Sequence, residues 1–355
     1  MHPTHFAIAV FLLSIPSWGQ GPGAGLIATN VETIQESMDS PHYQADFSPV
    51  IANGSHAVAW DKGHLVSFPV GEVKEPLLLH DRSGRLLFDQ WLEFKNAVRT
   101  YIQDAAVTTS GTAVVAGSVV NNDGASVDLI AEVGRDGIRH VIRTSPFYPF
   151  KVCATDQGTV WAYGEELGDD RKALYRHYAM LREYSFDKGE LRSVLDRSTV
   201  ILPKGVPIIG AREELQMRCN ANKVVLLNAP ARELIEYDLS ASSLRRWPLA
   251  PLPDGVDLVR ITGAALTDSG DFYVSTYDAP NVKALTRILR IRVTPSRTAD
   301  WVQVVATRSD SKWFVLLGSD GDDLVYSRTR HLPTVFWSRL AQGAAVSDTA
   351  IPEPR

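Results

Sequence analysis

The chain has 355 residues, with 36 Lys and Arg against 41 Asp and Glu, a net charge of −5, 45% apolar residues and two cysteines. The apolar fraction and the mixed charge exclude a disordered chain. The mildly acidic balance argues against a nucleic-acid partner, because phosphate binding needs a basic surface. Two cysteines cannot build a disulfide mini-domain. We therefore expect a globular protein with one large domain or two ordinary ones.

Residues 1–19 predict a secretory signal peptide. Residues 6–15 read FAIAVFLLSI, and Ser17-Trp18-Gly19 gives a small-x-small pattern with cleavage before Gln20. The apolar run is shorter than the roughly 20 residues of a membrane-spanning helix. An ordinary buried strand or a short anchor is the alternative, since the run is preceded by no Lys or Arg. We expect a secreted or periplasmic protein with no membrane insertion after cleavage, in a compartment that permits disulfides.

Residues 20–54 form the mature N-terminal segment, and from residue 55 onward short apolar runs alternate with turns. A tight turn recurs at Gly63, Gly111, Gly158 and Gly270, where glycine supplies the positive φ of a hairpin. A second turn recurs at positions 84, 137, 189, 242 and 295, which are spaced by 53, 52, 53 and 53 residues. A period near 50 with four short strands is typical of a propeller blade. Residues 171–183 have some helical spacing, but we interpret them as a long loop followed by a strand.

Six units fit the repeat, so we expect an all-β chain with six four-stranded blades. The units span residues 55–92, 103–144, 150–197, 215–249, 260–304 and 304–340, with long connections at 93–102, 198–214 and 249–259. Residues 270–340 hold seven strand runs where two blades need eight. We expect a strand from within 26–31 or 49–53 to supply the missing one and to close the ring. The propeller would then cover 55–341, followed by a disordered tail, 342–355.

The alternation of apolar strand, D-x-G turn and aromatic strand resembles the NHL and TolB-like six-bladed propellers. Residues 264–277, 152–164 and 181–195 carry this resemblance, which covers most of the mature chain loosely. It implies the fold and no single function. Propellers of this kind include protein-binding modules, glycan binders and, in a related shape, metal-dependent lactonases.

Catalytic and metal sites are sparse in the sequence. Asp104 and Asn220 are expected near the mouth of the central channel, with Arg218 close by, and they are too few to complete a calcium shell. The acidic stretches 121–124 and 320–323 fit hairpin turns between second and third strands. His56 and His64 fit polar strand residues, because a metal site needs three or four ligands. Catalytic residues therefore stay unknown, and we expect no metal and no cofactor, with calcium as the alternative.

Cys153 and Cys219 are expected in the inner strands of consecutive units. A disulfide needs α-carbons within about 7 Å, and equivalent points on neighbouring blades are usually further apart. We expect two buried thiols in preference to a bridge. Counting back from the turns, the inner strands carry small residues at Val58, Ala106, Cys153 and Ala265, with Ala306 in the sixth unit. The recurring tryptophans indicate packing between blades more than a sugar platform.

Three functions remain open. The preferred hypothesis is an exported, monomeric, non-catalytic propeller that binds a protein, peptide or glycan on one face, through loops that include 93–102, 165–178 and 198–214. The alternative is a lactonase-like hydrolase or lyase at the channel mouth, with or without calcium. A purely structural envelope protein is the third reading, and the sequence does not separate it from the first.

Overall fold

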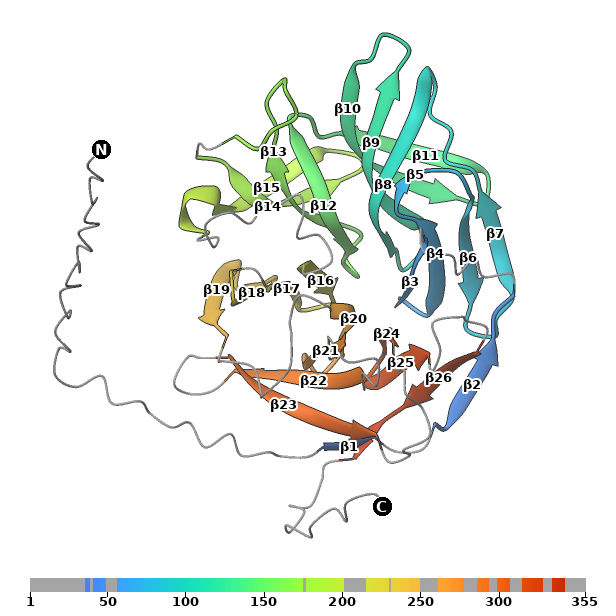
Figure 1. Ribbon diagram of the computed structural model, residues 1–355, viewed down its shortest axis with the longest axis vertical. Coiled ribbons are helices and arrows are strands. Elements are labelled where there is room, and N and C mark those ends of the chain that lie inside the picture. Colours follow the sequence, from blue (N-terminus) through green and yellow to red (C-terminus); the bar gives the residue numbers. More distant parts are fainter. Residues whose placement is uncertain are drawn as a thin grey trace, which may run out of the picture. The chain divides into compact units, whose positions relative to one another are not determined.

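The computed structural model describes residues 36–38, 41–48, 56–174, 177–200, 215–229, 231–249, 261–277, 286–293, 299–306, 315–327 and 334–341. Within them the chain is all-β apart from one short 3₁₀ helix. Six antiparallel blades form a ring, with each blade's first strand nearest the common axis (Figure 1). The predicted fold class, a six-bladed β-propeller, is confirmed. The signal peptide, residues 1–19, and the tail, residues 342–355, lie outside the described residues.

The strands of each blade follow one another in the chain, from the inner strand to the outer. Blade 1 contains β3 (His56–Asp61), β4 (His64–Pro69), β6 (Leu77–Asp81) and β7 (Leu86–Gln90). Blade 2 contains β8 (Ala97–Val107), β9 (Ala113–Asn121), β10 (Ser126–Gly134) and β11 (Gly137–Arg143), with β5 (Gly71–Glu72) added beside β8. Blade 3 contains β12 (Phe147–Ala154), β13 (Val160–Glu166), β14 (Ala179–Ser185) and β15 (Gly189–Asp196), followed by the 3₁₀ helix η1 (Arg197–Thr199).

The second half of the ring has the same strand order, except that the outer strand of blade 6 comes from the N-terminal part of the chain. Blade 4 contains β16 (Leu215–Cys219), β17 (Lys223–Asn228), β18 (Glu233–Asp238) and β19 (Ser243–Pro248). Blade 5 contains β20 (Ile261–Leu266), β21 (Phe272–Tyr277), β22 (Thr286–Val293) and β23 (Ala299–Ala306), and its outer edge continues into β1 (Glu36–Met38) and β27 (Leu340–Ala341). Blade 6 contains β24 (Val315–Asp320), β25 (Asp323–Ser327) and β26 (Thr334–Ser338), with β2 (Tyr43–Asp46) as its outer strand.

Ring closure by an N-terminal strand is confirmed, but the expected positions of that strand were wrong. The strand is β2, which pairs with β26 in register from Tyr43↔Trp337 to Asp46↔Thr334. The ranges 26–31 and 49–53 lie outside the described residues. Completing the last blade with a strand from the other end of the chain leaves no unpaired edge on β26.

The sequence placed the sixth blade one strand too early. Residues 299–306 form the outer strand of blade 5, so Ala306 is not on an inner strand, and the inner strand of blade 6 is β24. The residue equivalent to Ala265 is therefore Leu316, five residues before Gly321. The acidic stretch 320–323 consequently joins the first and second strands of its blade, whereas 121–124 joins the second and third strands of blade 2, as expected.

Each pair of neighbouring blades shares an apolar cluster, which explains why blades stack around an axis. Among the described residues there are six such clusters, one for each contact between neighbouring blades. Burying one face of a blade against the next is the main stabilising term, because a single blade cannot cover both of its faces. The expected packing role of tryptophan is confirmed for the buried Trp60, Trp161, Trp247 and Trp337, whereas Trp91 is 56% exposed.

Cys153 and Cys219 form a disulfide, so the expectation of two free thiols was wrong. Their α-carbons are 5.7 Å apart, inside the range that a disulfide needs. The physical reason is convergence of the inner strands toward the axis. The same convergence is visible elsewhere, because a Cβ on Gly263 would lie 1.7 Å from the carbonyl oxygen of Leu316 on the next blade.

Candidate functional site

Two faces of the ring differ in their connections. We call the face where the inner strands end the hairpin face, because short turns such as 61–64 and 155–159 lie there. We call the opposite face, where the inner strands begin, the loop face. It carries the connection between β4 and β6 in blade 1 and the chain that leads into each following blade.

The polar residues expected at the channel mouth are bonded to neighbouring blades. The Asp104 carboxylate accepts from the amide of Val152 at 3.0 Å. The Arg218 guanidinium donates to the carbonyl of Ala264 at 3.1 Å. Asn220 donates from its amide to the carbonyl of Thr267 at 2.9 Å, and its Oδ1 accepts from two amides of its own turn. These side chains join blades, and Asp104 and Asn220 serve two different blade contacts.

The hairpin face has a charged link that the sequence did not reveal. Lys62, in the turn of blade 1, forms an ion pair with Asp156, in the turn of blade 3. Next to it, Asp61 accepts from the amide of Val107 at 2.9 Å. Burial raises the pKa of Asp61, and the positive charge of Lys62 opposes this shift. The turns of three consecutive blades are thus tied together, which makes this face a rigid part of the ring.

On the loop face, β5 connects blades 1 and 2. After β4 the chain reaches Gly71, whose φ of +93° suits glycine. It then pairs with β8 through Gly71↔Ile102 and Glu72↔Tyr101, and the amide of Val73 donates to the carbonyl of Thr100 at 2.8 Å. We call residues 69–75 together with 97–102 the bracket. β8 is the longest strand of the described residues, at 11 residues, so the bracket extends blade 2 on this face.

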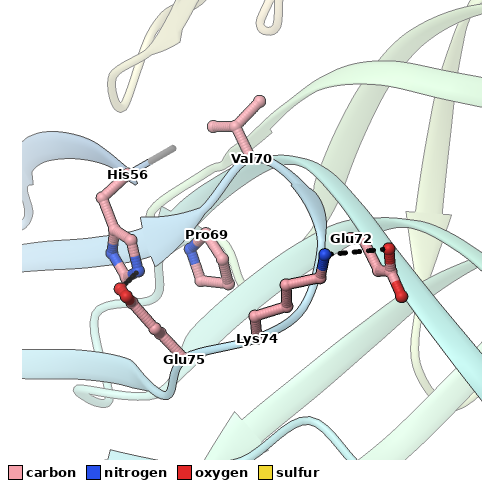
Figure 2. Close-up of a pocket in the computed structure, with 6 residues that line it drawn as sticks. All are labelled: His56, Pro69, Val70, Glu72, Lys74 and Glu75. Atoms are coloured by element: carbon pink, nitrogen blue, oxygen red, sulfur yellow. Dashed lines mark ion pairs between the residues drawn. The ribbon is translucent and has the colours of Figure 1, made fainter. Parts of the chain in front are cut away.

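A pocket of about 220 Å³ lies at the bracket, lined by His56, Pro69, Val70, Glu72, Lys74 and Glu75 (Figure 2). His56 points toward Glu75, with Nε2 2.6 Å from the carboxylate oxygen Oε2. On its other side, His56 Nδ1 lies 3.3 Å from the Ser67 hydroxyl. Lys74 and Glu72 form an ion pair at 3.4 Å.

The environment of His56 favours its neutral form. Its side chain is fully buried. Burial lowers the pKa of His56 below its usual value, and the neighbouring Glu75 carboxylate offsets part of the shift. A carboxylate can only accept hydrogen bonds, so its position 2.6 Å from Nε2 favours the tautomer with the proton on Nε2, in which Nδ1 is free to accept from Ser67. The Ser67 side chain is itself buried.

The three predicted binding loops have different fates. Most of 93–102 belongs to β8, so the connection is shorter than expected and spans 91–96. Residues 201–214 of the third loop lie outside the described residues. In the loop of blade 3, Arg171 makes a bidentate ion pair with the buried Asp128 of blade 2, at 2.8 and 2.9 Å. The expected loop-then-strand structure of 171–183 is confirmed by β14, with residues 175–176 undescribed.

No group of three or more His, Cys, Asp or Glu side chains that could hold a metal ion is found in the described part of the chain. No helix there is both long and apolar enough to cross a membrane. The pocket itself was missed in the sequence because His56 and Glu75 belong to different strands and connections. One signal was available in the sequence. Pro69 ends a strand and is followed by Val70-Gly71, a pattern that suits a chain leaving one blade to pair with a strand of the next.

Comparison with known proteins supports no assignment beyond the fold. No protein-family model matches the chain, and no curated protein matches it. The likeness to the NHL and TolB-like families is thus not confirmed beyond the fold they share.

Three similar solved structures have low sequence identity to this chain. A protein of unknown function from Bacteroides caccae is 14% identical, with 75% of this chain and 86% of that chain covered and a TM-score of 0.43. Hydrazine synthase from Kuenenia stuttgartiensis is 11% identical, with 87% and 77% covered and a TM-score of 0.38. The β-propeller domain of the Trilobed protease from Pyrococcus furiosus, described as having an open velcro topology, is 9% identical, with 64% and 63% covered and a TM-score of 0.38.

Proposed function

We propose that the protein is an exported, non-catalytic propeller that binds a protein partner on its loop face, at the bracket. The observation that carries this proposal is the exposure of large apolar side chains on the bracket, where Val70, which lines the pocket, is 41% exposed and Val98, on β8, is 54% exposed. Charged side chains, including Glu72 and Lys74, surround them. Apolar contacts with a polar rim are the usual composition of a protein interface. Aliphatic side chains favour a protein over a glycan, because valine offers a sugar neither a hydrogen bond nor an aromatic face.

Two features support export. The first is the signal-peptide pattern of residues 1–19. The second is the disulfide between Cys153 and Cys219, since disulfides persist mainly in oxidising compartments. Export to the periplasm or the medium, without an anchor and as a monomer, belongs to the same proposal.

The non-catalytic part of the proposal is supported by the partners of the polar residues that were expected at the channel mouth. Asp104 and Asn220, the groups on which a channel-mouth hydrolase would depend, are engaged in hydrogen bonds between blades. Calcium independence follows from the same reasoning. We expect the melting temperature to be unchanged by millimolar CaCl₂ and by subsequent EGTA, whereas a calcium-stabilised protein would show a reversible increase.

An affinity experiment tests the proposal. The purified chain is immobilised and exposed to the native extracellular or periplasmic fraction, beside the variants Val98→Asp and Leu191→Asp. Leu191 lies on the outer strand β15 and is 43% exposed, so it is a matched control for the added charge. We expect one protein to be captured by the parent and by L191D, and at least tenfold less of it by V98D, because a charge is placed at the centre of an apolar contact.

Equal capture by V98D and the parent would contradict binding at the bracket. Turnover of a lactone or a glycoside by the purified protein, with no partner recovered, would favour the hydrolase or lyase in its place. The melting temperatures of both variants should equal that of the parent, since both residues are exposed.

A further inference from the structure

We propose that β11, the outer strand of blade 2, binds an extended acidic segment of a protein as an added β-strand. This surface is the outer edge of a blade and not the bracket, so the inference goes beyond the proposed function. It assigns the mode of binding, which is strand addition, and the chemistry of the segment that binds.

The outer edge of β11 is open. β11 pairs with β10 on one side, and no strand of the described residues pairs with its other side. An unpaired edge presents a row of backbone N–H and C=O groups, to which an extended segment can add. A bulge opposite Glu132 and Val133 interrupts the pairing with β10 at Arg139. Residues 140–143 therefore form the regular part of the edge.

Blade 5 shows that an outer edge of this propeller accepts a further strand. Its outer strand, β23, pairs in parallel with β1, from Glu36↔Val304 to Met38↔Ala306. Three residues are enough for that pairing, and the regular part of β11 has four. The blades of this fold are thus compatible with strand addition at their rim.

The side chains of β11 give its edge a positive charge. Arg139 and Arg143 are exposed, and neither forms an ion pair with a residue that the structure describes. His140 pairs with Glu132 at 2.7 Å, and β11 itself carries no acidic residue. The turn before it, 135–136, holds one charge of each sign. The edge therefore differs in sign from the chain as a whole, which has a net charge of −5.

The exposed face of β11 carries an apolar side chain beside a basic one. Ile142 packs at the contact with blade 3, and His140 stacks on Phe186 of that blade, with ring centroids 5.8 Å apart. Because successive side chains of a strand point to opposite faces, Val141 and Arg143 point away from this contact. Val141 is 46% exposed. An added strand would therefore place an apolar residue opposite Val141 and an acidic residue opposite Arg143.

The other outer edges suit an acidic strand less well. β7 carries Asp89, and β15 carries Glu190 and Asp196, which would repel it. β19 ends in Pro248, which has no amide to donate. A second copy of β11 would also be repelled, because like charges would lie close across the pair. The basic edge thus favours an acidic segment over association of the chain with itself.

Fluorescence anisotropy with labelled peptides at low salt tests the proposal on the intact chain. The probe has the sequence TETVTET, which places its acidic and apolar side chains on one face of a strand. One control, TKTVTKT, has the opposite charge. The second control keeps the sequence TETVTET but has its three central amides methylated, which removes backbone donors and no side chain. We expect TETVTET to bind, TKTVTKT not to bind, and methylation to weaken binding about fivefold or more.

Variants of the chain locate the site. The double variant Arg139→Gln, Arg143→Gln should weaken binding of TETVTET about fivefold or more, because two unpaired charges are removed. Arg245→Gln removes an exposed arginine from β19 and should leave binding unchanged. Reversal of both charges, Arg139→Glu with Arg143→Glu, should abolish binding of TETVTET and produce binding of TKTVTKT. A variant that fails to fold would not gain binding, so the charge reversal keeps the test decisive.

Hydrogen exchange identifies the strand that binds. Bound TETVTET should slow exchange of the amides of β11 and leave those of β15 unchanged. Equal binding of the methylated peptide or of an oligothymidylate would show attraction of any polyanion and would overturn strand addition. Binding unaffected by R139Q/R143Q, or no gain of TKTVTKT binding on charge reversal, would overturn the assignment to β11. V98D should bind TETVTET like the parent, so the result is independent of partner capture at the bracket.

Discussion

The contact between blades 3 and 4 and the contact between blades 6 and 1 are stabilised in different ways. Blades 3 and 4 follow each other in the chain, and their inner strands are joined covalently by Cys153–Cys219. Blades 6 and 1 come from opposite ends of the chain. Their contact relies on the N-terminal strand β2 and on side-chain packing.

The contact between blades 6 and 1 is rich in aromatic residues. Trp60 of blade 1 and Trp337 of blade 6 pack edge to face, with ring centroids 5.0 Å apart. The guanidinium of Arg82 lies over the ring of Tyr43 at 5.2 Å and over that of Trp337 at 5.8 Å, and it also pairs with Asp320 at 3.2 Å. Each such contact contributes about 0.5–1.5 kcal/mol of stabilisation beyond that of the apolar area it buries.

The two contacts differ in the loss of chain entropy that their formation requires. Joining blade 6 to blade 1 closes a loop of almost the whole domain, and the cost of closure rises only slowly with length. Strand pairing and aromatic packing are sufficient for this. At the contact of blades 3 and 4, a covalent bond restricts the unfolded chain and adds to an apolar cluster that includes Trp161 and Tyr237.

Breaking the covalent contact has the largest expected effect. The double variant Cys153→Ala, Cys219→Ala should unfold with about 4 kcal/mol less free energy than the parent, because the bond spans a sequence separation of 66 residues. Denaturation by guanidinium chloride measures this loss, if the same m-value, the slope of the free energy of unfolding against denaturant concentration, is used for both proteins. The parent in reducing agent serves as the control and should approach the double variant. A loss below about 1 kcal/mol would show that the packing of blades 3 and 4 is sufficient without the bond.

In the non-covalent contact, the inner strand of blade 6 lies close to that of blade 1 at Gly318. A Cβ at Gly318 would lie 2.0 Å from the carbonyl oxygen of Trp60, a backbone atom that cannot move without shifting blade 1. We expect Gly318→Ala to lower the free energy of unfolding by about 3 kcal/mol. Gly168→Ala is the matched control, because its Cβ would first meet the flexible end of Leu174 at 3.2 Å. An unchanged midpoint for G318A in chemical denaturation would mean that the two blades are not in close contact.

Much of the fold could be predicted from the sequence because the turns carry their own signal. The spacing of turn glycines reports each blade locally, and it does not depend on what the blade packs against. The prediction failed at the sixth blade, where residues 307–314 separate β23 from β24 and lie outside the described residues. It also failed for β2, since the pairing of Tyr43 with Trp337 is a long-range contact without a turn to mark it.

The candidate site was harder to predict than the fold. Asp104, Arg218 and Asn220 stood out as charged or polar residues on inner strands, but the sequence could not show that their partners are backbone groups of the next blade. The disulfide was missed for the related reason that the distance between blades is set by three-dimensional convergence. The pocket depends on β5 leaving its own blade, which requires knowledge of the partner strand β8.

Glu165 offers the smallest test, at the contact of blades 3 and 4 on the loop face. Its side chain is fully buried on β13, and Arg197 of η1 lies close by, with Nε 3.7 Å from Oε1. Burial raises the pKa of Glu165 from 4.5 to about 7, although the charge of Arg197 lowers it. Tyr163 and Tyr178 complete the surroundings, and burial raises the pKa of Tyr178 to about 12, so neither tyrosine ionises near neutral pH.

Because the folded pKa of Glu165 is above its unfolded value, the folded state holds the proton more tightly. This contribution to stability is complete below about pH 4.5 and is lost as the pH rises through 7. We expect the parent to lose about 1 kcal/mol between pH 6 and pH 8 relative to Glu165→Gln, which cannot ionise. Chemical denaturation of both proteins at the two pH values measures the difference. If the two proteins instead lose stability in parallel between these pH values, Glu165 is already ionised and is neutralised by Arg197 in the folded state.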